Sequence, residues 1–88
     1  MEQQRLNWSC CIRDMIYKIT FSADMADVSD GPIFIMRMYG LEKDGFTYVL
    51  AILSNGTYRL YSKAQKKLYI KGRIAAIRWI PHVSKEVH

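Results

Sequence analysis

Acidic residues are missing from a long part of this sequence. The chain of 88 residues contains eight Asp and Glu residues, yet none lies between Gly45 and Lys85. Residues 1–45 carry five Lys and Arg against seven acids, a net charge of −2, whereas residues 46–88 carry eight against one, a net charge of +7. Such a local excess of positive charge indicates an anionic or acidic partner.

Cysteines and long apolar segments are also scarce. Cys10 and Cys11 are the only cysteines and are neighbours, so they offer no disulfide framework, because a disulfide between adjacent residues is strained. The longest apolar run, 48–53, is far shorter than the roughly 20 residues of a membrane-spanning helix. The first residues also lack the apolar core of a secretory signal. These absences predict an intracellular protein, cytoplasmic or nuclear, without membrane association.

Motifs for catalysis and for metal binding are absent from the sequence. There is no Gly-x-Ser-x-Gly, no phosphate-binding glycine loop and no His-Glu-x-x-His. Asp24, Asp27 and Asp30 stand three residues apart, whereas a calcium loop of the EF-hand type has acidic ligands two apart and a later glutamate. His82 and His88 lie at the far end of the chain from the cysteines, without the spacing of a zinc motif. We therefore expect a non-enzymatic protein with no cofactor and no metal.

Segments with strand-like composition fill the centre and the second half of the chain. They are rich in aromatic and β-branched residues or alternate between apolar and polar positions. Four of them follow one another: Ile33–Leu41, Phe46–Ser54, Thr57–Ser62 and Lys67–Lys71. Gly45 ends a tight connection between the first two, and Asn55-Gly56 separates the second from the third. Tight connections join antiparallel strands, so these segments predict a β-meander.

The Asn55-Gly56 dipeptide predicts the register of one hairpin, because it is favoured in two-residue type I′ turns. A turn of that length pairs Leu53 with Tyr58. Alternation along the two strands then divides their side chains between two faces. One face carries Val49, Ala51, Leu53, Tyr58 and Leu60, and the other carries Tyr48, Leu50, Ile52, Arg59 and Tyr61.

The following segment adds further cations and a further ring. Lys67, Tyr69 and Lys71 share one face of a strand, while Leu68 and Ile70 point toward a core. If the connection before this strand has an odd number of residues, the first three extend the face that carries the cations of the preceding strand. Such a face combines positive charge with flat aromatic rings.

The ends of the chain fit more than one kind of element. Apolar residues between 8 and 19 have helical spacing and also fit a strand, so we expect a short helix and then a strand from about Met15. Residues 73–80 fit a further strand, which their Ile, Trp and Arg content favours, or a short helix that Pro81 ends. The polar stretch Ser22–Gly31 is expected to form an exposed loop or a single helical turn.

Length and composition describe one small folded domain. Half of the residues are apolar and 24% are charged, as in ordinary globular proteins. The expected fold is α+β but mainly β: a small antiparallel β-meander sheet of four to six strands with a short N-terminal helix. Within a single domain of residues 1–88, residues 1–14 are the possible helix, 15–80 the sheet, and 81–88 a flexible tail.

The basic and tyrosine-rich face is the candidate binding surface. Its residues are Tyr48, Leu50, Ile52, Arg59, Tyr61, Lys67, Tyr69, Lys71 and Arg73. Tyrosines and apolar residues ringed by cations are typical of protein interfaces, so we expect association with an acidic protein or with a second copy of the chain. Nucleic-acid binding by the same face is the alternative, since rings stack on bases and cations pair with phosphates. Two further alternatives stay open: the cations only maintain solubility, or the segment around Trp8 covers the apolar side chains.

Overall fold

The computed structural model describes residues 7–29 and 32–82, which form a mainly β structure. Its strands are β1 (Trp8–Ile12), β2 (Met15–Ser29), β3 (Phe34–Lys43), β4 (Phe46–Leu53), β5 (Thr57–Ser62), β6 (Lys67–Arg73) and β7 (Arg78–Pro81). A single turn of 3-10 helix, η2 (Ile74–Ala76), precedes β7. Across these described residues there is no α-helix, and none of their elements is a helix long and apolar enough to cross a membrane.

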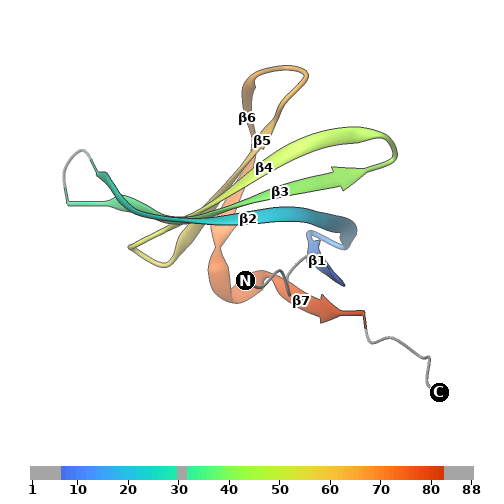
Figure 1. Cartoon of the computed structure of the whole chain (residues 1–88), viewed down its shortest axis with the longest axis horizontal. Helices are drawn as coiled ribbons and strands as arrows, with labels where there is room; N and C mark the ends of the chain where they lie inside the picture. The colour runs from blue at the N-terminus through green and yellow to red at the C-terminus, as the bar shows by residue number, and fades with distance from the viewer. Residues whose placement is uncertain (1–6, 30–31, 83–88) are drawn as a thin grey trace.

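All seven strands belong to one antiparallel sheet with the order β6-β5-β4-β3-β2-β1-β7. β1 to β6 form a meander, and β7 then pairs with the free side of β1. β6 and β7 lie at opposite ends of the sheet, yet only residues 74–77 separate them in the chain. The sheet must therefore curl until its two ends approach each other (Figure 1). Across this seam the guanidinium of Arg13 donates a hydrogen bond to the carbonyl of Lys71, at 3.4 Å.

The concave face of the curled sheet carries the hydrophobic core. The buried core residues are Cys10, Ile12, Tyr17, Ile19, Tyr39, Leu41, Leu50, Tyr58, Leu60 and Ile77. Beside them lies a tyrosine row, formed by Tyr17, Tyr48 and Tyr69, with ring centroids 5.2 and 5.6 Å apart. Each such aromatic pair stabilises the fold by about 0.5–1.5 kcal/mol beyond the burial of its area. The core therefore draws on alternate residues of five neighbouring strands.

The β3–β4 hairpin confirms the predicted tight connection. Asp44 and Gly45 have φ angles of 54° and 85°, as a two-residue type I′ turn requires. Arg13 and Asp14 connect β1 to β2 in the same manner, with φ angles of 54° and 67°. The antiparallel meander expected from the sequence is thus present.

The predicted register of the β4–β5 hairpin is wrong by one residue. Gly56 has a φ of 87°, but Asn55 does not have a positive φ, and the connection spans three residues, 54–56. As a result Ile52 pairs with Tyr58, and Leu50 pairs with Leu60. When the register shifts by one residue, the side chains of one strand change faces relative to those of the strand with which it pairs.

The predicted N-terminal helix is also wrong, and the sheet has seven strands rather than four to six. Residues 8–12 form β1 because Trp8, Cys10 and Ile12 alternate toward the core and suit a strand. β1 then provides the edge on which β7 pairs, which accounts for the additional strands. Residues 1–6 of the expected helix lie outside the described residues.

The polar stretch expected as a loop belongs largely to β2, which continues to Ser29. The β2–β3 pairing runs past two register shifts, one between Ile19 and Phe21 and one between Asp24 and Val28. These bulges allow a strand of 15 residues to follow the curl of the sheet. Polar residues therefore remain in a ladder where the sequence indicated a loop.

The segment after β6 contains part of the strand that its composition favoured, whereas the alternative helix ending at Pro81 is not present, because Pro81 lies in β7. Residues 74–76 form the 3-10 turn, and β7 follows. Pro81 and His82, expected in the tail, are held by β1: the His82 amide donates to the carbonyl of Asn7 at 2.7 Å, and its ring lies 2.6 Å from the hydroxyl of Ser9. The rest of the predicted tail, 83–88, lies outside the described residues.

Candidate functional site

The predicted binding residues are divided between the two faces of the sheet. Tyr48, Leu50 and Ile52 of β4 lie on the concave face, where Leu50 is fully buried and the other two pack against the core. Ser62 lies two residues beyond the core residue Leu60 and therefore shares its face of β5. Lys67 pairs with Ser62, so Lys67 also lies on the concave side. The exposed apolar patch expected around Leu50 is therefore absent from the described surface, because the curl covers it.

A β-bulge at Tyr69 separates the residues expected to share one face of β6. Lys71 pairs with Arg59 on the convex face, and on the other side of the bulge Leu68 pairs with Tyr61. Tyr69 falls between these pairs, and its ring joins the tyrosine row of the concave face. The connection before β6, residues 63–66, has an even number of residues. Tyr69 and Lys67 therefore do not lie beside Arg59 and Tyr61 on one platform.

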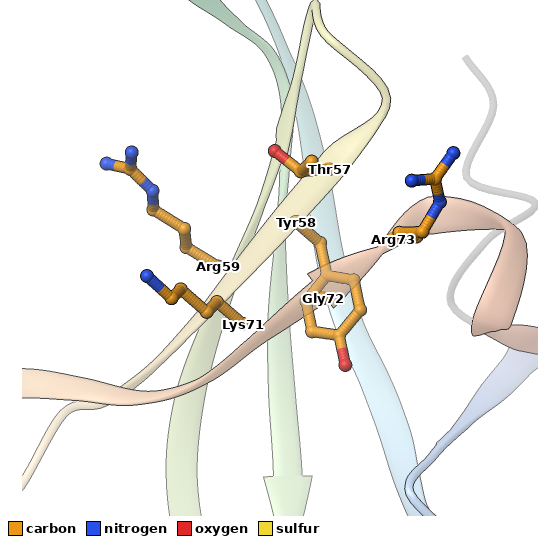
Figure 2. A pocket seen from close by; sticks show the side chains of 6 residues that line it. All are labelled: Thr57, Tyr58, Arg59, Lys71, Gly72 and Arg73. Carbon is orange, nitrogen blue, oxygen red and sulfur yellow. The ribbon is translucent and has the colours of Figure 1, made fainter.

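The convex face of the β5–β6 hairpin carries a cationic patch, formed by Arg59, Lys71 and Arg73. Arg59 lies opposite Lys71, and Arg73 lies opposite Thr57 in the adjacent pair. Together these side chains line a hollow of about 400 Å³ (Figure 2). In Figure 2 the side chains of Arg59 and Lys71 extend in the same direction, and that of Arg73 extends away from them. All three residues are exposed, and none forms an ion pair with another described residue.

An apolar row crosses the convex face next to this patch. It consists of Phe21, Val49, Tyr61 and Leu68. Phe21 is 49% exposed and Leu68 is 42% exposed, so the row is open to solvent at both ends. The ring of Phe21 lies over Gly40, where a Cβ atom would come within 2.5 Å of it.

Sequence reasoning missed the outer members of this row. Phe21 alternates in the sequence with Tyr17 and Ile19, which predicts one shared face of the strand from about Met15, and Leu68 was expected to face the core. For Phe21 the sequence contained one signal, Gly40, because a glycine within a strand often marks a bulge or a place where another group lies close to the backbone. The bulge at Tyr69, which turns Leu68 outward, has no comparable mark in the sequence.

The concave face opens into a separate aromatic groove of about 590 Å³. Tyr39 and Trp79 lie in contact there, with ring centroids 5.1 Å apart and planes tilted by 47°. Trp8 and Ile52 form part of the walls. Arg37 lies at this groove and forms an ion pair with Asp24 at 3.0 Å. The cation of this groove is thus already neutralised by a carboxylate, unlike those of the convex face.

Two titratable groups of the core, Cys10 and Tyr17, do not suit nucleophilic chemistry at neutral pH. Burial, reinforced by the neighbouring Cys11, raises the pKa of Cys10 to about 12. Burial also raises the pKa of Tyr17 to about 12, and the nearby tyrosines add to this effect. At the surface, the hydrogen bond from Lys43 to Asp44 raises the pKa of Lys43. Among the described residues no three His, Cys, Asp or Glu side chains gather into a metal-binding group.

Comparison of the chain with known protein families, with curated proteins and with solved structures gives no match. The interpretation of its surfaces therefore rests on their own geometry and charge. Of these surfaces, the convex face combines open apolar side chains with cations that have no ion-pair partner in the described part of the chain.

Proposed function

We propose that this protein is a non-enzymatic binding module whose convex sheet face engages an acidic protein partner. The supporting observation is the adjacency of the apolar row and the cationic patch. Tyr61 and Leu68 of the row lie on the same two strands as Arg59 and Lys71 of the patch. An apolar centre next to polar and charged residues is the usual anatomy of a protein interface.

The unpaired charge of the patch favours a partner other than a second copy of the chain. In a symmetric dimer the same surface patch meets itself, so Arg59, Lys71 and Arg73 would face identical cations. Like charges placed against each other across an interface cost binding free energy, whereas carboxylates on a partner would be complementary. The patch is therefore better suited to a different, acidic chain.

Nucleic-acid binding by this face is the competing function. Its cations could pair with phosphates, but the two rings of the row, Phe21 and Tyr61, are three strands apart, roughly 14 Å at the usual strand spacing. Between and beyond them the row presents aliphatic side chains, which do not stack on bases. These features suit an apolar protein surface better than a base-stacking platform.

Binding of two labelled probes distinguishes these functions. The probes are an acidic peptide of alternating Glu and Leu and a single-stranded oligonucleotide, titrated by fluorescence anisotropy at about 50 and 200 mM salt. We expect the peptide to bind, and Leu68→Ser and Arg59→Gln each to weaken it at least threefold. Lys63→Gln, in the exposed β5–β6 connection, is the matched control and should leave binding unchanged.

Two results of these titrations would overturn the proposal, and a third would come from sedimentation. One is tighter binding of the oligonucleotide with a loss of two or more orders of magnitude between the two salt concentrations, as release of counterions from phosphates produces. The other is equal peptide binding by wild type, Leu68→Ser and Arg59→Gln. Sedimentation of the unlabelled protein tests self-association, and a dimer lost on Leu68→Ser would also contradict a dissimilar partner.

A further inference from the structure

A hollow of about 510 Å³ lies at the seam where the two ends of the curled sheet approach each other. Its walls come from distant parts of the chain: the β1–β2 turn, the β5–β6 hairpin and the start of β7. In Figure 1 the chain runs from the end of β6 beneath the meander to β7, which lies beside β1. The closure of the sheet therefore creates a site that no single segment of the sequence encodes.

Three arginines line this hollow, each from a different segment. Arg13 belongs to the β1–β2 turn, Arg73 ends β6, and Arg78 begins β7. Within residues 7–29 and 32–82 none of them forms an ion pair. Arg13 is held toward β6 by its hydrogen bond to the carbonyl of Lys71. Arginines that line one hollow without forming ion pairs are typical of an oxyanion site.

The charge of the walls matches a dianion. Asp14 is the only carboxylate among the residues that line the hollow, so three positive charges and one negative charge leave a net of +2. A phosphate monoester carries about −1.5 to −2 at neutral pH, whereas a carboxylate carries −1. The charge balance therefore favours a phosphate over a carboxylate ligand.

Tyr58 gives a second, independent indication of a ligand. Its side chain is almost completely buried, and it lines the hollow. Its hydroxyl forms no hydrogen bond with any residue in the described part of the chain. In Figure 2 this hydroxyl points away from the side chains of Arg59, Lys71 and Arg73. A buried hydroxyl without a partner is uncommon in native proteins, and a phosphate oxygen would satisfy it.

The volume of the hollow indicates that the ligand is more than a bare phosphate ion. About 510 Å³ falls within the range of small-molecule sites, which extends from about 300 to 1,000 Å³. Ala76 and the ring of Tyr58 offer apolar surface beside the arginines. We propose that the seam hollow binds the phosphate group of a small organic phosphate monoester through Arg13 and Arg78, with Arg73 at its rim. This site is distinct from the proposed protein interface, although Arg73 borders both.

Titration with defined compounds tests this proposal on the full chain. We expect phenyl phosphate to shift amide resonances of the β1–β2 turn and of β7 in two-dimensional NMR spectra. Inorganic phosphate should bind more weakly, and benzoate at least tenfold more weakly. Since the second pKa of a phosphate monoester is near 6, binding should be tighter at pH 7.5 than at pH 5.5.

Substitutions test whether phenyl phosphate binds at the seam hollow. Arg13→Gln and Arg78→Gln should each weaken phenyl phosphate binding at least tenfold, and Tyr58→Phe should weaken it two- to fivefold. Lys63→Gln, away from the seam, should bind like wild type, and circular dichroism should show that each variant is folded. The proposal is overturned by absent shifts at 10 mM phenyl phosphate, by equal binding of benzoate, or by binding that both arginine substitutions leave intact. None of these results depends on whether the acidic peptide binds the convex face.

Discussion

Arg59 and Lys71 lie directly opposite each other in the β5–β6 hairpin, a cation facing a cation. Like charges at opposed positions destabilise an antiparallel pair, whereas opposite charges stabilise it by roughly 0.2–1 kcal/mol. No carboxylate in the described part of the chain pairs with either side chain. The two facing cations therefore lower the stability of the hairpin. Carboxylates of an acidic partner would neutralise them, in keeping with the proposed interface.

Lys71→Glu should separate stability from binding. The new carboxylate lies opposite Arg59, so we expect the free energy of unfolding to rise by about 0.5–1 kcal/mol at low salt and the gain to shrink at high salt. Binding of the acidic peptide should weaken at the same time, because the patch loses one cation and gains an anion. Urea unfolding at about 50 and 500 mM salt and the anisotropy titration measure the two effects.

Lys63→Glu is the control for the Lys71 substitution. It makes the same change of charge in the β5–β6 connection, outside the patch, and should alter neither stability nor peptide binding by a comparable amount. If Lys71→Glu stabilises the fold and leaves peptide binding intact, the patch only maintains solubility and the proposed interface is wrong.

The two strand glycines should differ in their tolerance of a methyl group. A Cβ on Gly72 would lie 2.9 Å from the hydroxyl of Tyr58 and 3.0 Å from its ring, and Tyr58 is almost completely buried within the core cluster. A Cβ on Gly40 would lie 2.5 Å from the ring of Phe21 and 2.9 Å from the hydroxyl of Thr20, and both of these residues are exposed, so we expect them to shift. We expect Gly72→Ala to lower the free energy of unfolding by about 1–3 kcal/mol and Gly40→Ala by less than about 1 kcal/mol. Chemical denaturation of both variants tests this order, and the reverse order would contradict the packing at Tyr58.

Most of the meander could be predicted from the sequence because its signals are local. Asp44-Gly45 has the composition of a type I′ turn, and the strands on either side of it were found where their apolar residues indicated. The Asn55-Gly56 dipeptide carries the same signal, but Ser54 joins the connection and shifts the register by one residue. A hairpin of three residues and one of two residues have nearly the same local sequence, so only the packing of Leu60 against Leu50 decides between them.

The composition of the candidate site depends on features that have no local signal. The bulge at Tyr69 keeps Lys71 on the convex face beside Arg59 and turns Lys67 to the other side. The seam depends on the closure of the whole sheet, which brings Arg13 to Arg78 across 65 residues of sequence. Contacts between strands, which local sequence does not reveal, determine both features.

Lys66 occupies a backbone conformation that suits glycine. Its φ of 55° is in the left-handed region, which costs a residue with a Cβ about 1 kcal/mol. Lys66→Gly should therefore raise the free energy of unfolding by up to about 1 kcal/mol, reduced by the greater entropy of glycine in the unfolded chain. Lys63→Gly, at a position without positive φ, should instead destabilise by about 0.4–1 kcal/mol. Thermal unfolding of the two variants side by side measures the difference, and two variants of equal stability would contradict the described turn.

Cys10 should make the protein less stable at alkaline pH. Burial raises its pKa from 9.0 to about 12 in the folded state, so above pH 9 the unfolded chain releases this proton while the folded protein keeps it. Stability is therefore fully retained below about pH 8.5 and decreases as the pH rises from 9 toward 12, by up to about 1.4 kcal/mol per pH unit. Tyr17 adds a similar loss between pH 10 and about 12.

The variant Cys10→Ala tests this assignment, because it removes the thiol at the cost of a small cavity. In this variant the free energy of unfolding should change less between pH 8.5 and 10, a range in which Tyr17 contributes little. Urea unfolding with a reductant present at these two pH values measures it, and an unchanged slope in Cys10→Ala would show that another group causes the alkaline loss.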